Sequence, residues 1–160
     1  MLRMSKLTDY ATVILAHLSH SDGELHTAAD VAARTGIALP TASKLLKSLT
    51  RAGLVASVRG AQGGYQLARA AEEISAADVI DALEGPVAIT ACSSADIQCD
   101  LESVCRVSSA WQRINSAIRL ALRDVSLAQL MGAPGTSGPR FDLAQPTHSD
   151  IEPASSGESR

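Results

Sequence analysis

Three cysteines, Cys92, Cys99 and Cys105, are the residues of this chain best suited to metal or redox chemistry. Six residues separate the first two and five separate the last two. Structural zinc sites usually hold paired ligands about two to four residues apart. Three soft thiolates with wider gaps suit an iron–sulfur cluster instead. The spacing alone also allows free thiols without a ligand, and an odd number of cysteines argues against a disulfide framework.

Three other uses of these thiols have different requirements. A cysteine enzyme needs a base beside its nucleophile, and no His or Asp pattern around the cysteines indicates one. A cluster-free redox sensor, in which Cys99 and Cys105 pair on oxidation, stays open. So does a zinc-stabilised adaptor that binds protein. The histidines have no ligand spacing, and we expect each to be structural or solvated: His17, His20, His26 and His148.

The composition indicates one globular domain without a membrane span. The chain has 160 residues, of which 46% are hydrophobic, enough to bury a core. Its few aromatic residues argue against a platform on which nucleic-acid bases stack. No apolar run approaches the roughly 20 residues of a spanning helix, and the N-terminus lacks the apolar core of a secretory signal. We therefore expect a cytoplasmic protein.

The charge is divided unevenly along the chain. Residues 1–70 carry eight Lys or Arg and four Asp or Glu, whereas residues 71–160 carry six and thirteen. Between Val31 and Ala71 there are six basic residues and no acid: Arg34, Lys44, Lys47, Arg51, Arg59 and Arg69. A basic block of this kind indicates a polyanionic partner; the alternative is an ordinary solvated basic face.

Two short helices joined by a glycine turn follow an N-terminal helix. The first helix is expected to begin at Thr8 as N-cap, with Asp9 in its first turn. The second should begin at Thr27 with a capping box to Asp30 and end at Gly36. The third should carry Pro40 in its first turn and run to about residue 52. This is the outline of a helix-turn-helix.

A hairpin is predicted next, with strands over 54–58 and 65–67 and a glycine-rich turn between them. A hairpin in this place is a wing, and Arg59 at its base would reach a minor groove. We predict that Thr41, Ser43, Lys44 and Lys47 of the third helix enter the major groove. The remaining expected DNA contacts are Arg51, Arg59 and Tyr65.

The second half of the chain is predicted to build a dimer. A fourth helix spans roughly 75–84, and residues 87–104 show no clear period. A heptad-like seam then extends over more than three repeats and suggests a long dimerisation helix, although a helix folded on its own core is the alternative. Its members are Val104, Val107, Trp111, Ile114, Ile118, Ala121, Val125 and Ala128. From residue 132 the Pro-, Gly- and Ser-rich tail is expected to be disordered.

Several stretches resemble one family of regulators. They are LTDYATVILAHL, ADVAARTGIALPTASKLLKSLTRAGLVASVRGAQGGYQLAR and ISAADVIDALEG, followed by the three cysteines and a long helix. Together they resemble the Rrf-two (Rrf2) family of winged-helix transcription regulators, typified by the IscR and NsrR types, and within it the regulators of SUF iron–sulfur assembly. The resemblance covers residues 1 to about 130.

The resemblance implies a homodimeric repressor that binds operator DNA and senses an iron–sulfur cluster on Cys92, Cys99 and Cys105. IscR-like members place a histidine where this chain has Ser108. NsrR-like members use an aspartate of the partner subunit near the start of the first helix, which Asp9 matches; Asp9 is otherwise a helix-start residue. Because the first cysteine gap is six rather than five residues, both [2Fe-2S] and [4Fe-4S] clusters stay open.

The expected fold is therefore mainly α with a small β-hairpin, a winged helix-turn-helix with a long C-terminal dimerisation helix. Three regions are predicted: a DNA-binding region over 1–72, a cluster-binding loop and dimerisation helix over 73–131, and the tail over 132–160. A cluster that orders its loop against the first helix and the dimer helix would change the separation of the two DNA-reading halves.

Overall fold

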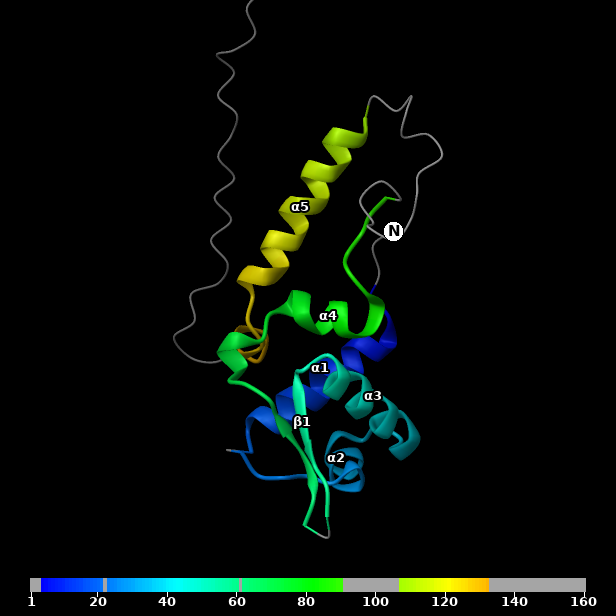
Figure 1. Ribbon diagram of the computed structural model, residues 1–160, viewed down its shortest axis with the longest axis vertical. Helices are drawn as coiled ribbons and strands as arrows, with labels where there is room; N and C mark the ends of the chain where they lie inside the picture. Colours follow the sequence, from blue (N-terminus) through cyan, green and yellow to red (C-terminus); the bar gives the residue numbers. More distant parts are fainter. Residues whose placement is uncertain (1–3, 22, 61, 91–106, 133–160) are drawn as a thin grey trace, which may run out of the picture.

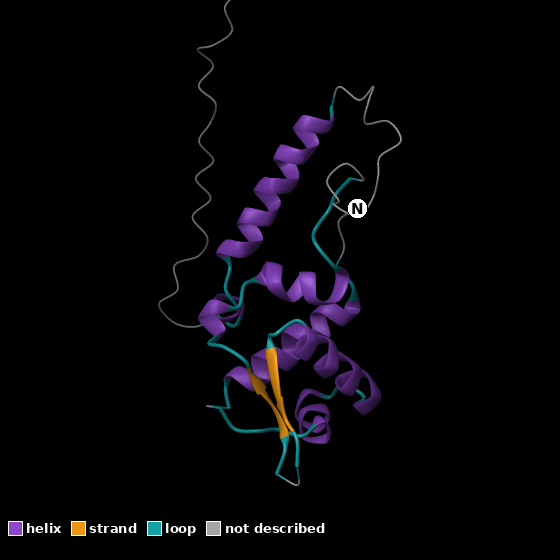
Figure 2. Cartoon of the chain, viewed as in Figure 1, coloured by secondary structure: helices purple, strands orange, loops and turns teal. Residues whose placement is uncertain are grey.

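A computed structural model describes residues 4–21, 23–60, 62–90 and 107–132. The helices and strands in that part of the chain are α1 Lys6–Ser19, α2 Ala28–Thr35, α3 Leu39–Arg51, β1 Val55–Val58, β2 Gly64–Leu67, the 3-10 turn η1 Ala71–Glu73, α4 Ala76–Glu84, α5 Ser108–Asp124 and α6 Leu127–Leu130. The expected class, mainly helical with one two-stranded hairpin, is confirmed (Figure 2). The three cysteines and nearly all of the predicted tail lie outside the described residues.

The first helix begins two residues before Thr8, so the predicted cap is wrong. Ser5 is the N-cap, and its hydroxyl accepts the backbone N–H of Thr8 at 3.4 Å. Thr8 lies inside the helix and is buried. Its hydroxyl instead donates to a carboxylate oxygen of Glu84, at the end of α4. Ser5 and Thr8 are both suitable N-cap residues. Because the hydroxyl of Thr8 is bonded to Glu84, the cap is formed by Ser5.

The helix-turn-helix follows the predicted signals. Thr27 and Asp30 form the expected capping box at the start of α2, and Gly36 ends the helix with a left-handed φ of 70°. Pro40 lies in the first turn of α3. Proline's fixed φ suits that position, and no backbone N–H is needed there.

The hairpin is antiparallel, with Val55 opposite Leu67 and Val58 opposite Gly64. It follows directly after α3 and packs on it. Figure 1 shows the hairpin beside α2 and α3, at the end of the molecule away from α5. The predicted wing is therefore present and lies next to the helix expected to read DNA.

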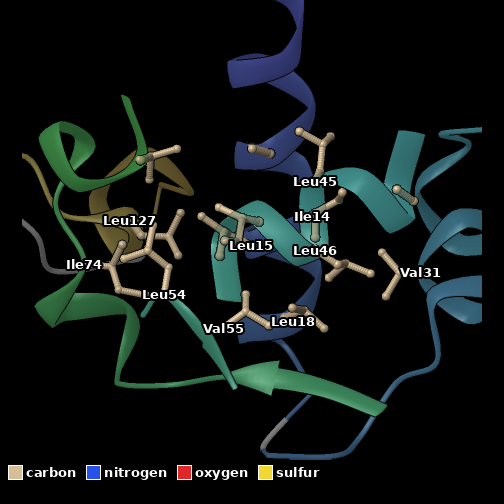
Figure 3. Close-up of a cluster of buried hydrophobic side chains, with 14 of the residues drawn as sticks. Ile14, Leu15, Leu18, Val31, Leu45, Leu46, Leu54, Val55, Ile74 and Leu127 are labelled. Atoms are coloured by element: carbon tan, nitrogen blue, oxygen red, sulfur yellow. The ribbon is translucent and has the colours of Figure 1, made fainter. Parts of the chain in front are cut away.

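One hydrophobic core joins helices α1 to α3 to the second half of the chain. Leu46 and Leu49 of α3 are fully buried against Ile14 and Leu15 of α1. Figure 3 shows Leu54, Ile74 and Leu127 gathered at one end of this cluster and Val31 at the other. The core thus includes residues from both sides of position 72, the predicted regional boundary.

The predicted continuous seam is wrong at its C-terminal end. Helix α5 ends at Asp124, and Val125 has an extended backbone. The chain then pairs with the start of α4: Val125 accepts the N–H of Ala76 at 2.8 Å, and Ile74 accepts that of Leu127 at 2.7 Å. Ala128 is consequently buried in the core rather than on the seam.

Helix α5 projects away from the body of the molecule (Figure 1). Among its own residues only Asn115 is buried. Trp111 and Ile114, two of the predicted seam residues, are 41% and 46% exposed. The described helices include none that is long and apolar enough to cross a membrane.

Candidate nucleic-acid interface

The outer face of α3 is basic and its inner face is apolar. Ala42, Leu45, Leu46 and Leu49 are buried, whereas Lys44, Lys47 and Arg51 are exposed. Residues three, four and seven apart share one side of a helix, so the three cations line one strip. Thr41 and Ser43, the other predicted contacts on this helix, are half-buried at its N-terminal end. The core thus fixes the orientation of the basic strip.

These cations have no carboxylate partner in the described part of the chain. The salt bridges described there are Arg69 with Asp78 at 3.0 Å and Arg119 with Asp81 at 3.8 Å. Arg69, although it belongs to the acid-free stretch, is therefore neutralised by α4. The strip on α3 is left to attract an external polyanion.

The wing adds a further cation beyond α3. Arg59 follows the last residue of β1, is exposed, and forms no salt bridge within the described residues. The turn after it is tight: the N–H of Gly63 donates to Gly60 at 3.0 Å. A Cβ at Gly63 would collide with the carbonyl oxygen of Val58. Only glycine therefore fits at this position of the turn. Tyr65, another predicted contact, is half-buried and packs against the core.

A two-bond backbone bridge fastens the wing to the helical body. His26, just before α2, donates its N–H to Tyr65 at 3.0 Å and accepts the N–H of Tyr65 at 2.8 Å. Gly64 lies against this bridge, and a Cβ there would lie 2.8 Å from the carbonyl oxygen of His26. The wing is thereby positioned by the segment that leads into the helix-turn-helix.

The predicted metal ligands are only partly within the described structure. Asp9 is exposed in the first turn of α1, where its charge also suits the helix dipole. The described residues alone gather no group of three or more side chains able to hold a metal ion. On the α4 side of the cysteine segment, the N–H of Ile89 donates to the buried side chain of Asn115 in α5 at 3.2 Å. The predicted donor set of three thiolates and one carboxylate would suit iron in its chemistry.

Glu84 connects the end of α4 to the start of α1, a contact that sequence patterns did not reveal. It accepts the N–H of Ser5 at 2.9 Å and the hydroxyl of Thr8. The Thr8 hydroxyl, followed by the Ser5 N–H, holds the pKa of Glu84 below its usual value. This contact joins α1, which bears Asp9, to the helix that leads toward the cysteines.

The three-helix unit, its wing and the basic strip define a winged helix-turn-helix protein. The model of one family, described as "Iron-dependent Transcriptional regulator", matches residues 4–133. The chain belongs to this family, Rrf2, and is one of its transcriptional regulators, which are not enzymes.

Relatives and solved structures agree with this assignment. Protein rrf2 of Nitratidesulfovibrio vulgaris is 33% identical over 131 residues, covering 81% of this chain and 87% of that protein. CymR, the global cysteine regulator of B. subtilis, is 32% identical with a TM-score of 0.62, over 82% of this chain and 98% of that one. IscR of T. potens is 29% identical with a TM-score of 0.59, and the match covers 86% of this chain and 94% of that one.

Proposed function

We propose that this chain reads operator DNA with α3 and the wing. The observation that carries the proposal is the exposed strip of Lys44, Lys47 and Arg51, which no described carboxylate neutralises. Thr41 and Ser43 lie at the N-terminal end of α3, the part of a recognition helix that approaches base edges. The cations bind phosphates and position the helix, which gives affinity but little sequence information.

Arg59 supplies the wing's contact in this proposal. Arg59 lies at the turn of the hairpin, not at its base as predicted, because it follows Val58, the last residue of β1. A guanidinium in that place suits the strongly negative potential of a narrow minor groove. Tyr65 contributes chiefly through its backbone, which holds the wing on the body. A direct contact of the Tyr65 ring with DNA stays a prediction.

The DNA-reading proposal is tested by sequencing the genomic fragments that the full-length protein retains, followed by titration of the best fragment. Arg59→Ala is expected to weaken operator binding more than random-sequence binding. An equal loss on both DNAs would make Arg59 a phosphate contact only. Failure of the protein to shift any fragment, with or without cluster, would refute the proposal.

We propose further that the protein acts as a homodimer through α5. A helix that buries only Asn115 leaves the N-terminal part of its apolar seam exposed, and such an exposed stripe marks an interaction surface. Val107, Trp111 and Ile114 are exposed members of the seam. Ile118 instead lines an apolar hollow together with Ile80 and Pro86 of its own chain. Twofold symmetry then matches two DNA half-sites.

The proposed signal is an iron–sulfur cluster held by Cys92, Cys99 and Cys105, with Asp9 of the partner subunit as the fourth ligand. Support comes from the donor chemistry, from the family's description as iron-dependent and from the likeness to IscR. A cluster held in this way would be sensitive to oxidants and to iron supply, since a carboxylate holds iron more weakly than a thiolate does. The proposed regulated genes are those of iron–sulfur assembly, and the proposed action is repression.

One observation favours a second candidate, a thiol sensor without a cluster. CymR, the global cysteine regulator, shares the fold at 32% identity. In that case oxidation would join Cys99 and Cys105 in a disulfide, with loss of two electrons and two protons to a peroxide or similar oxidant.

Visible absorption and iron analysis of anaerobically purified protein separate the two candidates. Cluster absorption that disappears in each of Cys92→Ala, Cys99→Ala and Cys105→Ala supports the cluster. Asp9→Ala is expected to assemble a cluster with altered spectra and faster decay in air. Full absorbance in the single cysteine variants would refute the cluster, and unchanged spectra in Asp9→Ala would remove Asp9 from the ligand set.

A further inference from the structure

Two histidine rings meet where α1, the segment before α2 and the wing come together. His17 lies near the end of α1 and His26 precedes the capping residue of α2. Their ring centroids are 5.0 Å apart and their planes are tilted by 56°. His26 is 8% exposed. The Nε2 atom of each ring is buried and has no hydrogen-bond partner among the residues that the structure describes.

The half-buried ring of His17, with its Nε2 atom buried, favours the uncharged state in this arrangement. A protonated imidazole donates from both nitrogens, and each unpartnered buried N–H carries a desolvation cost. Protonation of one ring also places a positive charge beside its neighbour. The pKa of His17 is accordingly held below its ordinary value, first by burial and then by His26, Arg34 and His20.

The surrounding groups provide little compensation for a proton. Arg34 of α2 and His20 of α1 add positive or potentially positive charge. A carboxylate that interacts with His26 is that of Asp30 in α2. It is exposed and already accepts the N–H and hydroxyl of Thr27, at 3.0 and 2.6 Å. Water therefore screens most of its attraction for His26.

The pair is joined directly to the wing. The backbone of His26 forms both bonds of the bridge to Tyr65 in β2, and Tyr65 itself is half-buried. Gly64 packs against the backbone of His26. A displacement of His26 must therefore disturb the docking of the wing on the helical body.

We propose that His17 and His26 form a proton-sensitive contact that docks the wing while the His17 ring is neutral and loosens it when that ring is protonated. Since the charged form is disfavoured in the folded chain, the unfolded chain takes up the proton first as the pH falls. The contact's contribution to stability is thus complete above the unfolded histidine's pKa, about 6.5, and declines below it. Acid should weaken the wing's share of DNA binding; that consequence rests on the proposed function.

The contact is tested on the full chain by NMR titration of the histidine rings and by urea unfolding between about pH 7.5 and 5.5. The ring of His17 is expected to titrate below its ordinary value. The ratio of folded to unfolded wild-type chain should fall at least about threefold more over this range than that of His17→Gln. His20→Gln, a change at the exposed C-cap of α1 and at the last-named contributor to the lowered pKa of His17, should retain most of the wild-type decline.

Operator binding is measured with the same proteins over the same range. The wild type and His20→Gln should lose affinity on acidification by at least about threefold more than His17→Gln. A His17 ring that titrates at or above its ordinary value would overturn the inference, as would an identical pH slope in His17→Gln. The ring titration requires no variant and decides the question if His17→Gln does not fold. Absence of operator binding at every pH would count against the proposed function, while titration and unfolding still decide the histidine contact.

Discussion

Replacement of Gly64 by alanine should detach the wing without destroying the helical core. The new Cβ would lie 2.8, 2.9 and 3.0 Å from the O, C and N atoms of His26. All three are backbone atoms, so no side-chain rotation relieves the contact. The segment at His26 must therefore move, and this movement would break the two backbone hydrogen bonds between His26 and Tyr65.

The expected magnitude follows from those two bonds. Each contributes about 0.5–1.5 kcal/mol net, so their loss should lower the free energy of unfolding by about 1–3 kcal/mol. A wing that is docked for a smaller part of the time binds DNA more weakly, and we expect about a tenfold rise in the operator Kd, equivalent to about 1.4 kcal/mol.

The assay combines urea unfolding with fluorescence anisotropy of labelled operator DNA. Ser57→Ala is the control, because Ser57 lies opposite Tyr65 in the same hairpin but is exposed. It should leave both quantities nearly unchanged. If Gly64→Ala has wild-type stability and wild-type affinity, the close approach at His26 does not position the wing, and the reasoning is refuted.

Three further predictions concern α3, α5 and the core. Lys47→Ala should weaken binding to operator and random DNA alike and lower the salt slope by about one, whereas Arg113→Ala on α5 should not; equal slopes would exclude a phosphate contact by Lys47. Ile114→Asp should give monomers in sedimentation, because a charge in the seam would be buried without a partner, while Leu120→Asp, off the seam, stays dimeric; a dimeric Ile114→Asp would place the interface elsewhere. Leu46→Ala, at a fully buried site, should cost about 2–5 kcal/mol in urea unfolding, and a loss well under 1 kcal/mol would contradict the described core.

Local signals in the sequence were sufficient to predict most of the DNA-reading half. Thr27 with Asp30, Gly36 and Pro40 act within one turn of their own positions, so their structural effects need no distant partner. The positions of the predicted cations Lys44, Lys47 and Arg51 on α3 likewise agree with its exposed face. Once a helix is predicted over these residues, their helical spacing predicts the basic strip as well.

The errors arose where distant contacts decide between local alternatives. Ser5 and Thr8 are both able to cap α1, and Glu84, at the far end of α4, makes Thr8 a buried partner instead. The seam continues past Val125 in sequence, but pairing with Ala76 holds that residue extended. Ser126 and Gln129 form a capping box whose pattern is visible in the sequence and would have indicated the new helix.

The histidine pair had no comparable signal. His17 and His26 come from different elements with a turn between them, and no periodicity relates them. Only the packing of α1 against α2 and the wing brings their rings together. The expectation that both are structural or solvated therefore missed their mutual contact.

The most direct test of the central claim compares operator affinity of the cluster-loaded and cluster-free forms of the same full-length protein, measured anaerobically at one salt concentration. We predict that the two Kd values differ by at least about fivefold, the lower end of typical coupling between sites. Cys99→Ala should bind with the affinity of the cluster-free form, whether or not iron and sulfide are supplied. Equal affinities of the loaded and cluster-free wild-type protein would contradict the claim that a cluster controls DNA binding.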